Sequence, residues 1–223
     1  MNITYVDQFD FQNKNVIARF DFNVPVAEEN GAQVISDTTR IDLALPTIKI
    51  ILNSGAKQIV LMSHLGRPKG GPSKKYSLEP VAKYLALKLN QDVLLTESAT
   101  DRGIKTILEI GKNKIILLEN LRFHPEETNN DPDFAKHLAS YGEVYVNDAF
   151  GAAHRKHAST YGIISNFHKN NCVAGLLLKN EIESLSKVVE TPEKPFVAII
   201  GGAKISDKIK IIDRLLSSVD FLL

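Results

Sequence analysis

The chain has 223 residues, about one and a half domains at roughly 150 residues per domain. Its 27 lysines and arginines against 26 aspartates and glutamates leave a formal net charge of +1, which excludes a nucleic-acid binder that depends on bulk positive charge. The single cysteine, Cys172, excludes an internal disulfide and a CxxC metal or redox motif. Residues 1–15 lack the apolar stretch of a signal peptide, and no apolar run approaches the roughly 18 residues that span a bilayer. We therefore expect a cytoplasmic protein that binds neither membranes nor nucleic acid.

Short apolar runs alternate along the chain with longer segments of helical period. In chain order, strands are expected at 16–20, 59–63, 92–96, 115–118, 144–147 and 196–200, and another strand is expected to enter at 220–223. Most of these runs are apolar throughout, which is typical of strands buried on both faces of a sheet. Helices are expected at 38–53, 77–89, 132–141, 177–190 and 206–218.

Capping and breaking residues mark the ends of two of these helices. Asp131 comes directly before Pro132, the expected order for an N-cap and a first helical position, and Gly142 comes just past the end of the same helix. The helix at 38–53 is expected to be broken near Pro46 and to be closed by Gly55.

The alternation of strands and helices predicts an α/β fold. A parallel sheet lies between two layers of helices in such a fold, a three-layer Rossmann-like arrangement. An eight-stranded α/β barrel is the alternative, but six strands are too few for it. Two prolines bracket the segment 191–195, which is typical of a linker. We therefore expect a nearly complete domain over 1–172, an interdomain helix and linker over 173–195, and the first strand and helix of an incomplete second domain over 196–223.

Polar and cationic residues follow the predicted strands at their carboxyl ends, the edge at which ligands bind in open parallel sheets. They are Asp21, Asn23, His64, Arg67, Arg122 and Arg155, and Arg40 joins them where the helix at 38–53 begins. Arginine recognises carboxylate and phosphate groups through planar, bidentate hydrogen bonds. The set therefore predicts a pocket for a small, multiply charged anion.

Each of these residues also has a purely structural interpretation. A single arginine near a strand end is usually a solvated or ion-paired surface residue. His64 could equally be an ordinary loop histidine, and Asp21 and Asn23 could cap a turn before Pro25. Four arginines gathered at one edge of a sheet favour the anion pocket.

A second candidate anion site lies at 201–208. Its two glycines allow the backbone to approach a ligand, and the helix that begins at Ser206 offers its N-terminus to an anion. Lys204 and Lys208 lie at this positive helix end, where an anion would stabilise them; the alternative is two surface lysines of an amphipathic helix.

Several common functional motifs are absent from the sequence. No complete Walker A loop, no GxGxxG after the first strand and no zinc or GxSxG motif occurs. Their absence disfavours the dinucleotide-binding, hydrolase and metalloenzyme classes, and no metal site is expected.

Five longer segments combine these residues in one order. They are RFDFNVP at 19–25, MSHLGRPKG at 62–70, LLENLRFHPEE at 117–127, VNDAFGAAHRKHAS at 146–159 and GGAKISDKI at 201–209. Together they resemble the phosphoglycerate kinase family, and they correspond to about the first half of the family's pattern. The resemblance implies an amino-terminal domain that binds phosphoglycerate and a carboxy-terminal domain that binds magnesium nucleotide.

The resemblance implies transfer of a phosphoryl group between 1,3-bisphosphoglycerate and ADP, giving 3-phosphoglycerate and ATP, by a monomer. It assigns substrate binding to Asp21, Phe22, Asn23, Arg40, His64, Leu65, Gly66, Arg67, Arg122 and Arg155. It assigns nucleotide binding to Lys204 and Lys208, and catalytic roles to Arg40 and Lys204. Mg²⁺ is implied with ATP or ADP, and its ligands are expected in the half of the pattern beyond Leu223. The alternative is a non-catalytic phosphoglycerate-binding fragment, and we expect the chain alone to bind phosphoglycerate without turnover.

Overall fold

The computed structural model describes residues 3–29, 31–68, 71–190, 194–201, 209–216 and 218–223. The chain forms two compact units, Met1–Lys179 and Asn180–Leu223. The boundary between them falls inside helix α7 (Leu176–Glu190). The division into 1–172, 173–195 and 196–223 stays a prediction.

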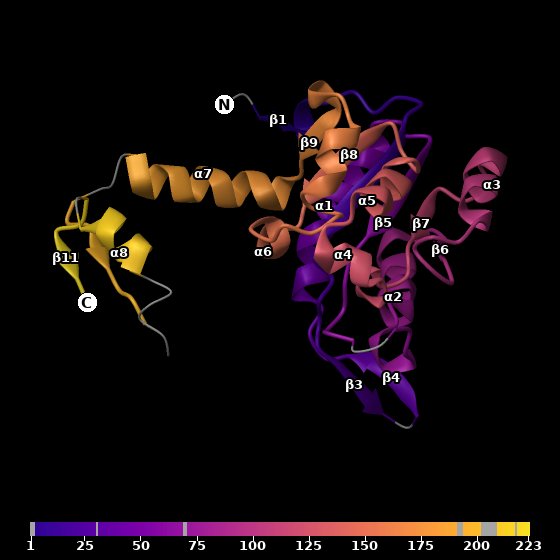
Figure 1. Cartoon of the computed structure of the whole chain (residues 1–223), viewed down its shortest axis with the longest axis horizontal. Coiled ribbons are helices and arrows are strands. Elements are labelled where there is room, and N and C mark those ends of the chain that lie inside the picture. The colour runs from indigo at the N-terminus through magenta and orange to yellow at the C-terminus, as the bar shows by residue number, and fades with distance from the viewer. Residues whose placement is uncertain (1–2, 30, 69–70, 191–193, 202–208, 217) are drawn as a thin grey trace. The chain divides into compact units, whose positions relative to one another are not determined.

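A seven-stranded sheet forms the centre of the first unit (Figure 1). In spatial order its strands are β1 (Thr4–Tyr5), β9 (Cys172–Ala174), β8 (Val144–Asp148), β2 (Asn15–Phe20), β5 (Gln58–Met62), β7 (Ile115–Leu117) and β6 (Val93–Leu95). Every neighbouring pair is parallel. The predicted α/β class is therefore confirmed, and each strand expected before residue 172 is present.

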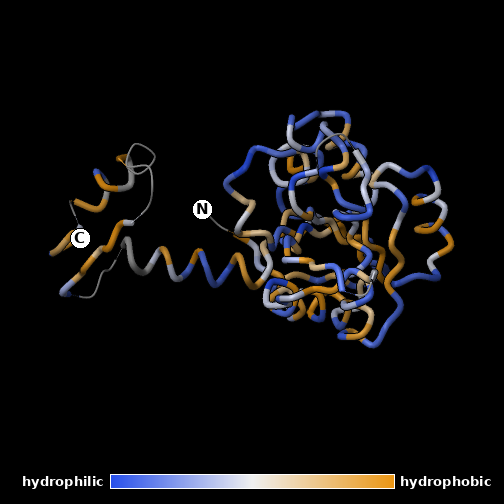
Figure 2. Tube along the Cα trace, turned by 90° about the horizontal axis from the view of Figure 1, so that it is seen from below, coloured by the Kyte–Doolittle hydropathy of each residue, from blue (hydrophilic) through white to orange (hydrophobic). Residues whose placement is uncertain are grey.

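Helices cover both faces of this sheet. The helices of one layer are α1 (Thr39–Asn53) and α2 (Glu79–Leu89), and those of the other are α3 (Gly103–Ile110) and α5 (Pro132–Ala139). Val16 packs with the first layer and its neighbour Ile17 with the second, because successive strand residues point to opposite faces. Figure 2 shows the hydrophobic segments gathered inside this unit, with hydrophilic segments around them.

Shorter elements connect these layers. Within the described residues they are η1 (Val6–Gln8), the antiparallel hairpin of β3 (Val26–Glu29) and β4 (Ala32–Ile35), η2 (Lys74–Tyr76), η3 (Leu121–Phe123), α4 (Pro125–Asn129), α6 (Phe150–Ala153), η4 (Gly162–Asn166) and η5 (Lys169–Asn171). The second unit contains α8 (Ile209–Leu215) and a parallel pair formed by β10 (Val197–Ala198) and β11 (Phe221–Leu222), so both strands expected there are present. None of the described helices combines the length and the apolar character that crossing a membrane requires.

The break that the sequence predicts near Pro46 is wrong. Helix α1 is continuous, with Pro46 inside it. Proline removes one helical N–H donor and clashes with the preceding turn, so it usually kinks or ends a helix. Here Leu45, Thr47 and Ile48 are buried beside the proline, and this packing against the sheet holds the helix in place. Gly55 closes the helix as expected, with a φ of 79°.

The connections of the sheet change direction between two adjacent strands, β2 and β8. After β2 the chain continues to β5 on one side, and after β8 it continues to β9 on the other side. In open α/β sheets, ligands bind beyond the carboxyl ends of the strands at such a switch point. Asp21 follows β2 directly, and α6 begins two residues after β8 ends, so both segments lie at the position where a ligand is expected.

The cap of α5 is confirmed, but the glycine after it has a different role. Asp131 accepts a hydrogen bond from the backbone N–H of Phe134 at 2.8 Å, as its N-cap position predicts. Gly142 passes so close to β2 that a Cβ atom there would lie 2.8 Å from the backbone nitrogen of Ile17. The position therefore requires glycine because of the neighbouring strand.

We expect Gly142→Ala to lower the free energy of unfolding by about 1–3 kcal/mol, because the added methyl group overpacks the sheet. Urea unfolding followed by circular dichroism measures this change. Gly201→Ala is the matched control, since no atom of the described residues lies within 4 Å of the corresponding Cβ position. Equal stability of the two variants would contradict this role for Gly142.

Candidate functional site

The loops after β2, β5 and β7 meet at Gly66. Its backbone N–H donates to Oδ1 of Asn23 at 2.7 Å, and its carbonyl accepts from Nη1 of Arg122 at 2.6 Å. Gly66 has a φ of 60°, and a Cβ atom there would lie 2.4 Å from the ring of Tyr76. Only glycine fits, so three loops that carry predicted site residues are held in one arrangement.

A buried side chain, that of Asn120, supports the same loops. Asn120 is fully buried, and its Nδ2 donates to the carbonyls of Leu65 and Tyr76 at 2.8 and 2.9 Å. Its Oδ1 accepts from the backbone N–H of Arg122 at 3.1 Å. Glu119 accepts from the backbone N–H of Asn120 at 2.8 Å. The loops are thereby fixed from inside the protein.

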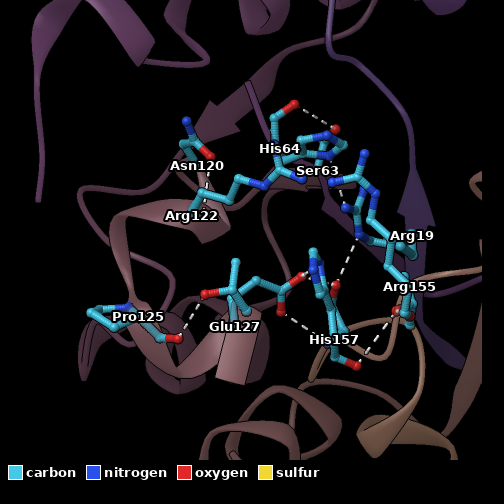
Figure 3. A network of polar contacts seen from close by, with 12 residues as sticks. Arg19, Ser63, His64, Asn120, Arg122, Pro125, Glu127, Arg155 and His157 are labelled. Atoms are coloured by element: carbon cyan, nitrogen blue, oxygen red, sulfur yellow. Dashed lines mark hydrogen bonds and ion pairs between the residues drawn. The ribbon is translucent and has the colours of Figure 1, made fainter. Parts of the chain in front are cut away.

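A buried arginine lies at the centre of the site. Arg19 belongs to β2 and is fully buried. Its Nε donates to Oγ of Ser159 at 2.9 Å, its Nη1 to the carbonyl of Phe20, and its Nη2 to Nδ1 of His64 at 2.9 Å (Figure 3). Burial lowers the pKa of Arg19, while the carboxylates of Glu127 and Asp21 raise it. The sequence did not identify Arg19 as a site residue, although a single charge within an apolar strand signals a buried, paired group.

The contact with Arg19 determines the protonation of His64. A guanidinium can only donate hydrogen bonds, so Nδ1 of His64 must be the acceptor and the ring proton must sit on Nε2. Burial lowers the pKa of His64 far below its ordinary value, and the charges of Arg19, Arg122, Arg155 and His157 lower it further. His64 is therefore neutral, and its Nε2–H has no hydrogen-bond partner among the described residues.

Two further arginines lie close to this pair. Burial lowers the pKa of Arg122 to about 10, and the neighbouring charges of Arg155, Arg19 and Arg67 act in the same direction. We call Arg19, Arg122 and Arg155 the cationic cluster. They come from β2, η3 and the segment after α6, and Figure 3 shows them around His64 and Glu127. Mutual repulsion between these cations favours the binding of an anion.

Asp21 and Arg40 form an ion pair beside this cluster. Nη1 of Arg40 lies 2.7 Å from Oδ2 of Asp21, and the side chain of Arg40 is 52% exposed. Oδ1 of Asp21 also accepts from the backbone N–H of Asn23 at 3.1 Å. A Cβ atom on Gly151 would lie 2.7 Å from Oδ2 of Asp21, so α6 packs directly against this carboxylate. An exposed pair of this kind contributes only about 0–1 kcal/mol and leaves Arg40 able to change partner.

Other predicted site residues are placed differently. The side chain of Phe22 is fully buried and stacks on Phe20 at a centroid distance of 5.4 Å, and Leu65 is also buried. Only their backbone groups could therefore meet a ligand. Arg67 is exposed. Lys204 and Lys208 lie outside the described residues.

The residues at the end of β8 have structural partners. Asn147 Oδ1 accepts from the backbone N–H of Ala149 at 3.0 Å, and Asp148 Oδ1 accepts from the backbone N–H of Leu178 at 3.0 Å. Burial raises the pKa of Asp148, while hydrogen bonds from Thr47 and from the start of α7 partly offset this by lowering it. These two side chains hold the loop and the helix that follow them.

The described residues contain no group of three or more histidine, cysteine, aspartate or glutamate side chains placed to hold a metal ion. The neutral Nε2–H donor of His64 and the guanidiniums of Arg122 and Arg155 can instead hold an anion. Fold and site together define an open α/β protein with a candidate anion-binding site at the carboxyl edge of its sheet, suited to a phosphate or carboxylate group.

Comparison with known proteins identifies the family. The sequence model of the family described as phosphoglycerate kinase matches residues 6–223. The phosphoglycerate kinase of Acidobacterium capsulatum is 51% identical over 225 residues, which cover 98% of this chain and 54% of that protein. The solved structure of phosphoglycerate kinase from Coxiella burnetii matches with a TM-score of 0.83 at 38% identity, covering 99% of this chain and 54% of that one. The chain belongs to the phosphoglycerate kinase family.

The same comparisons show how much of a family member this chain represents. The phosphoglycerate kinase of Moorella thermoacetica is 51% identical over 215 residues, 96% of this chain and 53% of that protein. The solved structure of phosphoglycerate kinase from Pyrococcus horikoshii matches with a TM-score of 0.82 at 30% identity, and the match covers 99% of this chain and 54% of that one. The chain spans about half the length of the curated relatives it matches.

The neutral state of His64 predicts a dependence of stability on pH. Its pKa is lowered in the folded protein, so below about pH 6.5 the unfolded chain binds a proton that the folded chain does not. The free energy of unfolding should therefore fall as the pH drops, by up to about 1.4 kcal/mol per pH unit for this one histidine. His64→Gln should make the decline shallower. Urea unfolding between about pH 5 and 8 measures the slope.

The control for this experiment is His154→Gln, which removes an exposed imidazole. Burial also lowers the pKa of His124, His137 and His157, so all variants keep a residual slope. The test is the difference in slope between His64→Gln and His154→Gln. Identical slopes would show that His64 takes up a proton in the folded protein.

Proposed function

We propose that this chain is the phosphoglycerate-binding half of a phosphoglycerate kinase. Such an enzyme transfers a phosphoryl group between 1,3-bisphosphoglycerate and ADP, giving 3-phosphoglycerate and ATP. The observation that supports the proposal is the cationic cluster with neutral His64 at the switch point of the sheet, in a chain whose family is known.

The 3-phosphate group is proposed to bind to His64, Arg67, Arg122 and Arg155. Two of these residues are already oriented without a ligand: Arg122 by Gly66, and His64 by Arg19. The guanidinium of Arg155 has no hydrogen-bond or ion-pair partner among the described residues, and Arg67 is exposed, so both are free to close on the phosphate. Bidentate guanidinium hydrogen bonds suit its oxygens.

The glycerate end is proposed to bind to Asp21 and Asn23, which can accept from its hydroxyl group and donate to its carboxylate. The backbone groups of Phe22, Leu65 and Gly66 complete this part of the site. Arg40 is proposed to leave Asp21 and to meet the transferring phosphoryl group, because its ion pair is exposed and weak. Phosphoryl transfer requires mainly alignment of the reactants and stabilisation of charge on the equatorial oxygens, which a cluster of arginines provides.

The nucleotide side of the reaction is proposed for the second unit. Lys204 is proposed to follow the transferring phosphoryl group, and Lys208 to contact the nucleotide phosphates. Mg²⁺ enters with ATP or ADP, and no ligand for it is assigned among the described residues. A monomer in the cytoplasm remains part of the proposal.

A non-catalytic phosphoglycerate-binding fragment is the second candidate. The observation that favours it is that all described residues of the candidate anion site lie in the first compact unit, Met1–Lys179. A coupled assay for ATP formation from 1,3-bisphosphoglycerate and ADP separates the two candidates: ATP formation supports the enzyme, and binding without ATP formation supports the fragment. If ATP forms, Arg40→Ala should lower kcat by about 10²–10³-fold, the effect of losing one charge-stabilising donor.

We expect the 223-residue chain to bind 3-phosphoglycerate, and Arg122→Ala to weaken this binding by about 10- to 100-fold, the effect of losing hydrogen bonds to a charged group. Arg67→Ala should act in the same direction. Isothermal titration calorimetry measures the dissociation constants.

Lys57→Ala is the control for charge. It removes one positive charge directly before β5, at the opposite edge of the sheet, and should leave the affinity unchanged within about twofold because salt screens distant charges. No detectable binding by the unaltered chain, or an equal loss in the Lys57 and Arg122 variants, would overturn the proposed site.

A further inference from the structure

One carboxylate lies buried beneath the cationic cluster. Glu127 is in α4 and is fully buried. Its Oε1 accepts from Oγ of Ser159 at 2.6 Å, and its Oε2 accepts from the backbone N–H of Ser159 at 3.0 Å. Nδ1 of His157 lies 3.7 Å from Oε1. The carboxylate therefore holds the segment that follows Arg155 against α4.

A continuous chain of hydrogen bonds leads from Glu127 to the candidate ligand site. Ser159 donates its hydroxyl proton to Glu127, so its oxygen is left to accept from Nε of Arg19. This contact fixes the plane of the Arg19 guanidinium, whose Nη2 donates to Nδ1 of His64. The last group in the chain is the Nε2–H of His64, a proposed donor to the phosphate.

Glu127 also differs from the other carboxylate that acts on Arg19. Asp21 is paired with exposed Arg40 and is itself partly exposed, so water and ligand can replace its contacts. Glu127 has no exposed surface, and its charge raises the pKa values of Arg19 and Arg122. Glu127 is thus a buried counter-charge to Arg19 and Arg122 in a site proposed to bind an anion, although a carboxylate by itself would repel such a ligand.

We propose that Glu127 is a positioning residue: acting through Ser159 and Arg19, it holds His64 in the Nε2–H form that binds the phosphate group. This inference rests on the proposed function, because it assumes that the site binds 3-phosphoglycerate. Glu127 itself touches no part of the ligand in this arrangement.

Whether Glu127→Gln strengthens or weakens the binding of 3-phosphoglycerate distinguishes a positioning role of Glu127 from a purely electrostatic one. If Glu127 acted only by its charge, Glu127→Gln would make the site more positive and 3-phosphoglycerate would bind more tightly. If Glu127 positions the chain of hydrogen bonds, the same change weakens binding. A carboxamide offers one acceptor oxygen to the two donors of Ser159, and its NH₂ group opposes one of them.

We expect Glu127→Gln to weaken the binding of 3-phosphoglycerate to the 223-residue chain by about tenfold or more, the effect of losing a hydrogen bond to a charged group. Calorimetry measures the affinity, and thermal unfolding shows whether the variant is folded. The matched control is Glu126→Gln, which removes the same charge one residue earlier from an exposed side chain. Tighter or unchanged binding in the Glu127 variant would overturn the inference.

A second measurement needs no ligand. The ¹⁵N resonances of the imidazole ring distinguish the two neutral tautomers, and the unaltered chain should show His64 only as the Nε2–H form between about pH 5 and 8. Ser159→Ala, which removes the intermediate hydroxyl, and Glu127→Gln should both give a mixture of tautomers. An unchanged His64 spectrum in both variants would overturn the inference even if binding is weaker.

The two measurements keep this inference apart from the proposed function. If the unaltered chain does not bind 3-phosphoglycerate, the proposed function fails, while the tautomer of His64 still shows whether Glu127 positions it. If the chain binds 3-phosphoglycerate and the tautomer does not respond to either substitution, the function stands and the positioning role fails.

Discussion

The site depends on the burial of one guanidinium. Arg19 lies in the middle of a parallel sheet, where an unpaired charge would cost several kcal/mol. Its partners come from three places: the carbonyl of Phe20, His64 after β5, and Ser159 beyond β8. Satisfying Arg19 therefore brings together the loops on both sides of the switch point, and the positions of the ligand-facing residues follow from it.

Around this contact the site has a buried part and an exposed part. The buried part, with Asn120 and Glu127, is held by hydrogen bonds that exist without a ligand. The exposed part, with Arg40 and Arg67, has weak contacts or open surface. Rigid donors reduce the cost of ordering the site when an anion binds, while exposed arginines can move to the ligand as it arrives.

Much of the fold and part of the site could be predicted. Long apolar runs and capping residues predicted the central strands and the helices α1, α2, α5 and α7, but not α3. The rule that ligands bind at carboxyl strand ends indicated His64 and Arg122 as candidate site residues. The strands β1 and β9 were missed, because two or three residues are too short to show a period. Glu127 and Ser159 were missed because nothing near them in the sequence shows that they are buried together.

The sequence by itself determined the α/β class, the family and the residue types gathered at one edge of the sheet. These properties depend on local periodicity and on motifs of neighbouring residues. Only the tertiary structure decided which charges are compensated, which nitrogen of His64 carries the proton, and that α1 continues through Pro46. The physical reason is distance along the chain: Arg19 contacts residues 45 and 140 positions away, and burial and hydrogen bonding between such residues exist only after the chain has folded.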